Sequence, residues 1–205
     1  MNGSWGGVLI GVIGISILSI FSASQQTVEF SSPLNTSGQI TVGGRPTPYL
    51  IRHLPVNSFP LLPPPVQDEL TGRGCLIPQT YEARQPENAV HASLERSGSS
   101  DWAVLCSAKG EVSLLVFFAS SPAGPMTLAV APETERLQSH GSSPVLGFDW
   151  AIDPASPEQV HQAQMSMRHI PVRPDHDALA DSVIDRKTIY HFYQKNAWML
   201  LDTQD

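Results

Sequence analysis

The sequence predicts an α+β fold, built mainly of antiparallel β-sheet with two short helices and one disulfide. Alternation of apolar and polar residues recurs after residue 88, two segments carry helix-start signals, and there are only two cysteines. The chain has 18 prolines and 15 glycines among 205 residues, which favours short elements joined by many loops. About six or seven strands are expected.

The clearest strand signals lie in the middle of the chain. Residues 89–95 alternate apolar and polar side chains, as a half-buried strand does. Residues 101–107 and 111–118 predict a hairpin with Gly110 in the turn, because glycine tolerates a positive φ. The second of these strands is apolar on both faces and is expected to be central. Weaker patterns predict two further strands, over residues 126–130 and 148–152.

Helix signals appear twice before a final hairpin. The segment from Ser156 to Gln159 combines an N-cap serine, a first-turn proline and a capping-box glutamine, and this helix is expected to end before Pro171. A shorter helix is expected at residues 66–70, ended by one of two glycines, Gly72 or Gly74. The closing segments predict a hairpin rich in aromatic residues, over residues 188–193 and 197–201.

The N-terminus indicates export. Residues 5–21 carry no charge and are apolar, which is typical of a signal peptide or of a short membrane anchor within residues 1–24. Small residues before Gln25 favour cleavage, whereas the missing basic flank and a Pro/Ser-rich tether over residues 25–64 favour retention. Both alternatives stay open, and either one places the expected globular domain, residues 65–205, in the periplasm, at the cell surface or in the medium.

The cysteine pair fits an oxidising compartment. Cys75 and Cys106 are expected to form a disulfide, which would stabilise the domain by roughly 3–4 kcal/mol in the chain-entropy model. Two buried free thiols are the alternative. No Cys-x-x-Cys motif is present, which argues against a redox enzyme.

Charge restricts the partners that the chain can bind. The net charge of −7 excludes an ordinary nucleic-acid ligand, because phosphate binding needs a basic surface. No Lys/Arg-rich run is present to bind anionic lipid, so the expected membrane contact is through residues 5–21, if they are retained.

Two constellations are candidates for chemistry. His161, Met165 and His169 would share one helix face and could hold copper(I), although a solvated helix face is the alternative. Carboxylates beside an imidazole could form an acid–base or metal site, and they occur as His176, Asp177 and Asp181. The alternative there is that Asp177 caps a short helical turn over residues 178–180. No nucleophile, zinc-protease or phosphate-loop motif is present, and no cofactor is predicted.

Five parts of the chain carry a further signal: residues 74–79, 101–107 and 115–117, the Asp175–Asp177 region and the final hairpin with Trp198. Together they resemble a group of uncharacterised secreted bacterial proteins. The resemblance covers most of residues 61–205 and implies a shared fold without an assigned activity. Residues 101–104 are also similar to one FG-GAP-type blade, but the preceding loop, residues 96–100, lacks the alternating aspartates of that calcium site.

These observations favour an exported, non-enzymatic module that binds a protein or a glycan. A hydrolase-like or metal-dependent enzyme that uses the region of His176 and Asp177 is one alternative. A periplasmic metal-binding protein that uses His161 and Met165 is the other.

Overall fold

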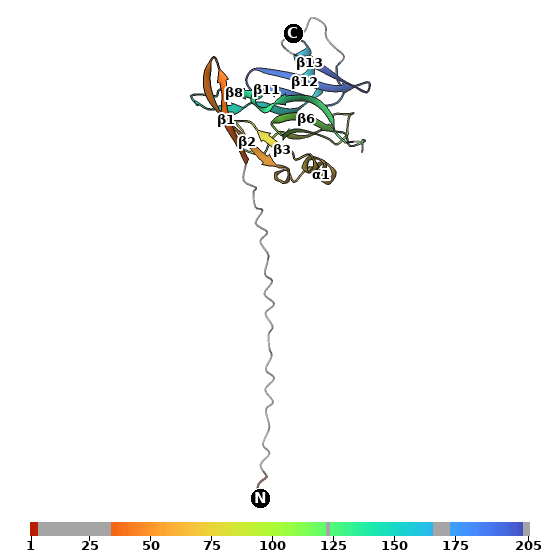
Figure 1. The fold of residues 1–205 in the computed structure, drawn as a ribbon. Helices are drawn as coiled ribbons and strands as arrows, with labels where there is room; N and C mark the ends of the chain where they lie inside the picture. Colours follow the sequence, from red (N-terminus) through yellow and green to blue (C-terminus); the bar gives the residue numbers. More distant parts are fainter. Residues whose placement is uncertain (4–33, 122–123, 166–172, 203–205) are drawn as a thin grey trace.

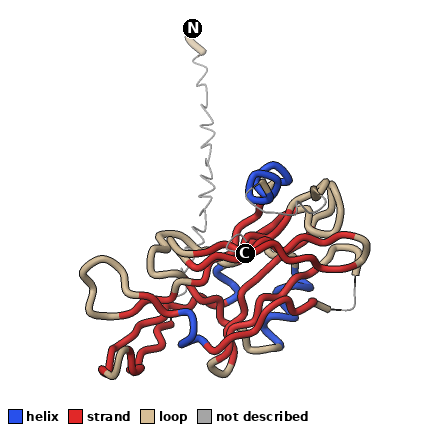
Figure 2. The backbone as a smooth tube through the Cα atoms, turned by 90° about the horizontal axis from the view of Figure 1, so that it is seen from above, coloured by secondary structure: helices blue, strands red, loops and turns tan. Residues whose placement is uncertain are grey.

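The computed structural model describes residues 1–3, 34–121, 124–165 and 173–202. Within these ranges there are thirteen strands, two α-helices and two 3₁₀ turns, and strands are the main secondary structure (Figure 2). The predicted fold class is confirmed. The predicted strand number is too low, because several strands are short or lie in segments rich in proline and serine. Among the described residues, no helix combines the length and apolar character needed to cross a membrane.

The larger sheet contains nine strands, two of which pair in parallel while the other pairings are antiparallel. Its strands are β1 (Leu34–Val42), β2 (Arg45–Pro55), β3 (Leu76–Gln79), β4 (Ala89–Ala92), β5 (Asp101–Ala108), β6 (Glu111–Phe117), β7 (Met126–Pro132), β8 (Leu137–Gln138) and β9 (Leu146–Phe148). The smaller, antiparallel sheet contains β10 (Trp150–Ala155), β11 (Ala178–Val183), β12 (Lys187–Gln194) and β13 (Ala197–Asp202).

The two sheets pack against each other, and each is covered by a helix on its outer face (Figure 1). The central core joins residues of both sheets, among them Leu105, Leu114, Phe148, Trp150 and Leu179. Helix α1 (Pro64–Gly72) and the 3₁₀ turn η1 (Val56–Ser58) cover the larger sheet, and α2 (Pro157–Gln164) covers the smaller one. A second 3₁₀ turn, η2 (Glu133–Arg136), follows β7.

The local signals in the middle and at the end of the chain are confirmed. Strands β5 and β6 form the expected hairpin, and β6 is buried on both faces between β5 and β7. The capping box at Ser156 is present, and β12 and β13 turn at Lys195 and Asn196, which both adopt positive φ. The hairpin aromatics pack on both sides, with Phe192 under α2 and with Tyr193 and Trp198 against Phe118.

The predicted tether over residues 25–64 is wrong for its later part. Strand β2 pairs with β1, β3 and β9, and Ile51 is fully buried in the central core. Phe59 and Leu62 are also buried, beside α1. Three prolines of this segment lie within β2, the last of them directly before η1, so composition gave a misleading signal. Residues 4–33, which hold the predicted signal or anchor, lie outside the described residues.

Two further local predictions need correction. Residues 148–152 do not form one strand, because the chain passes from β9 of the larger sheet to β10 of the smaller one at Asp149. Residues 178–180 begin strand β11, so Asp177 does not cap a helix there. Ala178 and Ala180 face α2 while Leu179 faces the central core, so this run is buried on both faces of the sheet.

Asn88 joins the two sheets across the core. Its side-chain amide donates to the carbonyl oxygens of Pro78 (2.8 Å) and Trp150 (3.0 Å), and its Oδ1 accepts from the amide of Ile152 (3.0 Å). Its backbone has a φ of 68°, a conformation that asparagine adopts more readily than most residues. One buried side chain therefore satisfies backbone groups of β3 and β10 together.

Candidate functional site

An apolar groove lies on the outer face of the larger sheet, where the cover of α1 and η1 ends. Its floor is formed by Trp102 of β5 and Phe117 of β6, which stand directly opposite each other in the antiparallel register. Further along the same face, Val104 and Leu115 are buried under α1 and η1, whereas Trp102 and Phe117 are only half-buried. The groove thus continues an apolar strip of the sheet beyond its cover.

Two hollows meet at the Trp102 ring, and we call the pair the Trp102 groove. One hollow, of about 580 Å³, lies between Trp102, Phe117 and the start of α1, where Pro63, Pro65 and Val66 form the wall. The other, of about 380 Å³, lies between Trp102 and the turn at residues 58–62. Both linings are mostly apolar. Trp102 stands as a ridge between two spaces that could each accept an apolar side chain.

The rim of the Trp102 groove carries a small number of polar groups. The ring of His91 lies 4.9 Å from the Trp102 ring, and His91 Nε2 is 2.7 Å from the hydroxyl oxygen of Ser100. Glu69 forms an exposed ion pair with Arg73 on the other side. Leu61 at the end of the smaller hollow is 83% exposed, a high value for a large apolar side chain.

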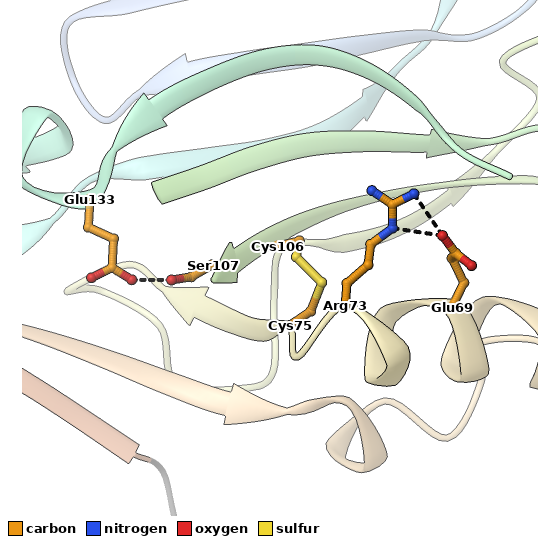
Figure 3. The surroundings of a disulfide bond; sticks show 6 residues. All are labelled: Glu69, Arg73, Cys75, Cys106, Ser107 and Glu133. Atoms are coloured by element: carbon orange, nitrogen blue, oxygen red, sulfur yellow. Dashed lines mark hydrogen bonds and ion pairs between the residues drawn. A yellow bond between two sulfur atoms is a disulfide. The ribbon is translucent and has the colours of Figure 1, made fainter. Parts of the chain in front are cut away.

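The wall of the groove is held by a helix stop and a disulfide. Gly74 has a φ of 71°, and the amides of Gly74 and Cys75 donate to the carbonyls of Thr71 and Leu70, which is the Schellman pattern that ends α1. Cys75 is joined to Cys106 of β5, with a Cα–Cα distance of 5.0 Å. Figure 3 shows this bond beside the Glu69–Arg73 pair of α1. The helix that lines the groove is therefore covalently tied to the strand that forms its floor.

The predicted catalytic residues do not form a single site. His176 pairs with Asp175, whose carboxylate oxygen lies 2.6 Å from Nδ1. Asp177 accepts a hydrogen bond from the amide of Ser93 (3.0 Å), which fixes the loop after β4. Asp181 is buried on β11 and faces His191 of β12 at 3.2 Å. The three side chains thus bond to three different partners, which lie on different segments.

His176 borders a hollow of about 260 Å³ that Glu95 and Tyr193 also line. The hydrogen bond with His176 lowers the pKa of Asp175, whose side chain is exposed. Nε2 of His176 is buried and has no hydrogen-bond partner among the described residues. An Asp–His pair of this kind can act as a general base when Nε2 reaches a substrate.

The predicted metal ligands are only partly described. His161 lies on α2, which ends at Gln164, and Met165 follows as an exposed residue. His169, together with Met167, lies outside the described residues. Among the residues that the structure describes, no three His, Cys, Asp or Glu side chains are grouped so that they could hold a metal ion.

Sequence reasoning missed a buried polar cluster formed by His53, Ser107 and Glu133. Glu133 Oε1 lies 2.9 Å from His53 Nε2 and accepts a hydrogen bond from the hydroxyl of Ser107 (Figure 3). All three residues are buried. The carboxylate is in the middle, whereas nucleophilic catalysis needs histidine between the acid and the hydroxyl. The cluster instead joins β2, β5 and η2, which are distant in sequence and share no motif.

This cluster predicts a pH dependence of stability. The hydrogen bond with His53 is the largest influence and lowers the pKa of Glu133 below its ordinary value of 4.5, even though burial acts in the opposite direction. The stabilisation is therefore complete above about pH 4.5 and is lost as pH falls through the lowered pKa. We expect Glu133→Gln to be less stable at pH 7 and to lose less stability on acidification below pH 4.5, measured by urea unfolding.

Asp149 provides a control of opposite sign. Burial raises its pKa above the ordinary value of 3.8, so its contribution is present below pH 3.8 and is lost as pH rises through the raised pKa. Asp149→Asn should flatten the stability profile just above pH 3.8 and leave the Glu133 effect in place. Equal acid sensitivity of the wild type and Glu133→Gln would contradict the assignment to Glu133.

Comparison with known proteins adds no identification. The chain matches no protein-family model, no curated protein and no solved structure.

Proposed function

We propose that this protein is an exported, non-enzymatic binding module that holds an extended, apolar segment of a partner protein in the Trp102 groove. The observation that carries the proposal is the half-buried Trp102 between two apolar hollows of about 580 and 380 Å³. An extended segment presents side chains at regular intervals, and two neighbouring hollows separated by an aromatic ridge fit such a ligand.

The lining of the groove favours a peptide over a glycan. Sugars are bound by many directed hydrogen bonds in addition to an aromatic face, whereas these hollows offer mainly carbon surface from Pro63, Val66 and Phe117. The polar rim at His91 and Ser100 is already engaged in its own hydrogen bond. Trp102 supplies a large apolar contact with little loss of side-chain entropy, a property of residues that dominate interfaces.

Export is part of the proposal and rests on the sequence and on the cysteines. Residues 5–21 have the composition of a signal peptide or an anchor. The Cys75–Cys106 disulfide is compatible with an oxidising compartment. An acid–base function at His176 is less well supported, because Nε2 is buried while the partner Asp175 side chain is 88% exposed. A substrate that approaches from solvent therefore does not reach this nitrogen.

The proposal is tested with a displayed library of random peptides selected against the full chain. We expect apolar sequences to be enriched and to bind with micromolar affinity. Trp102→Ala should weaken this binding at least about tenfold, because loss of an aromatic anchor at an interface commonly costs more than 1 kcal/mol. Affinities are measured by fluorescence polarisation with the selected peptides.

Leu200→Ala is the matched control, since Leu200 is an exposed apolar residue of β13 outside the groove. It should bind the selected peptides like the wild type. A glycan array is screened in parallel with the same variants. Glycan binding that depends on Trp102, or peptide binding that does not, would overturn the assignment of a protein ligand to this groove.

A further inference from the structure

Strand β1 is an edge strand without the features that usually prevent edge-to-edge pairing. Among the described residues it pairs only with β2, so its outer edge is free along nine residues (Figure 1). It contains no charged residue and no proline. Natural proteins commonly protect free edges with charges, prolines, bulges or short strands. Here β7 has a register shift and ends in Pro132, and β8 has two residues, but β1 has none of these protections.

The register of the β1–β2 hairpin shows which backbone groups point outward. Gly43 and Gly44 form a two-residue turn with φ of 56° and 79°, and Val42 faces Arg45 across it. This flanking pair is hydrogen-bonded, and bonded and non-bonded pairs alternate along the ladder. The even-numbered residues of β1 therefore bond to β2. The outward amides and carbonyls belong to the odd-numbered residues, namely Asn35, Ser37, Gln39 and Thr41.

The sequence of β1 is self-complementary about Gly38. When two copies run antiparallel with Gly38 facing Gly38, the outward-pointing residues meet in pairs, Asn35 with Thr41 and Ser37 with Gln39. On the face that carries the core residue Ile51, Leu34 then meets Val42 of the other copy and Thr36 meets Ile40. Apolar residues thus gather on one face and polar residues on the other. This register pairs all nine residues, and a shift of two leaves some unpaired.

We propose that β1 pairs with β1 of a second copy of this chain in this register, which joins the two larger sheets into one continuous sheet across a twofold axis. The pairing buries Leu34 and Val42, which are 52% and 48% exposed in the single chain. It places no like charges opposite each other, although each chain carries a net charge of −7. The interaction is isologous and closes as a dimer.

Proline substitution at an outward amide tests the edge. Ser37→Pro removes an N–H that the hairpin itself does not use, and proline is tolerated on edge strands for this reason. Light scattering of the full chain should give twice the 22.2 kDa mass for the wild type and the single-chain mass for Ser37→Pro. Added salt should strengthen the dimer, because it screens the repulsion between two acidic chains.

Leu200→Pro is the matched control on a free edge of the smaller sheet, that of β13. In the β12–β13 register Leu200 also points its amide outward, and its side chain is exposed. This variant should remain dimeric. A monomeric wild type, or a dimer that Leu200→Pro disrupts and Ser37→Pro does not, would overturn the proposal. The N-terminal apolar segment is common to all three proteins, so association through it would leave all three masses equal and would also overturn the proposal.

Disulfide trapping tests the register. Residues 36 and 40 face each other between copies as a non-bonded pair, with an expected Cα separation of about 4.5 Å that suits a disulfide. Within one chain they are about 13 Å apart along the strand and cannot be bridged. Thr36→Cys/Ile40→Cys should give a covalent dimer on oxidation. Asn35→Cys/Ile40→Cys places its thiols on opposite faces and should not, and equal trapping of both variants would contradict this register.

Discussion

Asp101→Ala should destabilise the protein by about 4 kcal/mol. The side chain of Asp101 is fully buried and accepts four hydrogen bonds. Three come from backbone amides, those of Leu94 (2.9 Å), Glu95 (2.8 Å) and Ala119 (2.9 Å), and the fourth comes from the hydroxyl of Ser99. Each hydrogen bond to a charged group contributes about 1.5–3 kcal/mol, and the sum is reduced because they are not additive.

The reason for this large effect is the position of Asp101 at the start of β5. Its carboxylate holds the loop after β4 and the chain after β6, which both border the Trp102 groove. Asp177→Ala is the matched control, since among the described residues the Asp177 carboxylate accepts one hydrogen bond, from the amide of Ser93. It should cost about 1.5 kcal/mol, the lower end of the range for a hydrogen bond to a charged group, because Asp177 is only half-buried. Urea unfolding gives both values, and equal losses in the two variants would contradict the structural role of Asp101.

Removal of the disulfide should cost about 3 kcal/mol. Cys75 and Cys106 are 31 residues apart, and closure of a loop of this size restricts the unfolded chain by about 3–4 kcal/mol in the entropic model. Cys75→Ala/Cys106→Ala is therefore expected to unfold at lower urea concentration than the wild type. Because the bond ties α1 to β5, the variant should also bind the selected peptides more weakly, since the wall of the groove is less fixed.

Reduction provides the control for the disulfide variant. Dithiothreitol should lower the stability of the wild type to that of the double variant and should leave the variant itself unchanged. If the double variant were as stable to urea as the oxidised wild type, the bond would not stabilise the fold. A further loss on reduction of the variant would indicate that the reagent acts elsewhere.

The parts of the fold that were predictable have strong local signals. The hairpin of β5 and β6 follows from alternation and a glycine turn, and the capping box at Ser156 fixes where α2 begins. Prediction of the disulfide needed only the expected compartment and the number of cysteines. In each case neighbouring residues carry enough information to determine the element.

The parts that were missed depend on contacts between distant residues. Strand β2 has three prolines and a pattern of mixed polarity, and only its pairing with β1, β3 and β9 makes it part of the sheet. The Trp102 groove combines β5, β6 and the proline-rich start of α1, and no short motif contains all three. The cluster of His53, Ser107 and Glu133 likewise joins residues up to 80 positions apart.

The most direct test of the proposed function is to follow the indole N–H resonances of the full chain by nuclear magnetic resonance during titration with a selected apolar peptide. Trp102 lines the groove, whereas Trp150 is buried in the central core. Trp198 lies on β13 and packs against Phe118. Binding in the groove should shift the Trp102 resonance with a saturable dependence on peptide concentration and leave Trp150 in place. A saturating shift of the Trp198 resonance with an unchanged Trp102 resonance would contradict the proposed function.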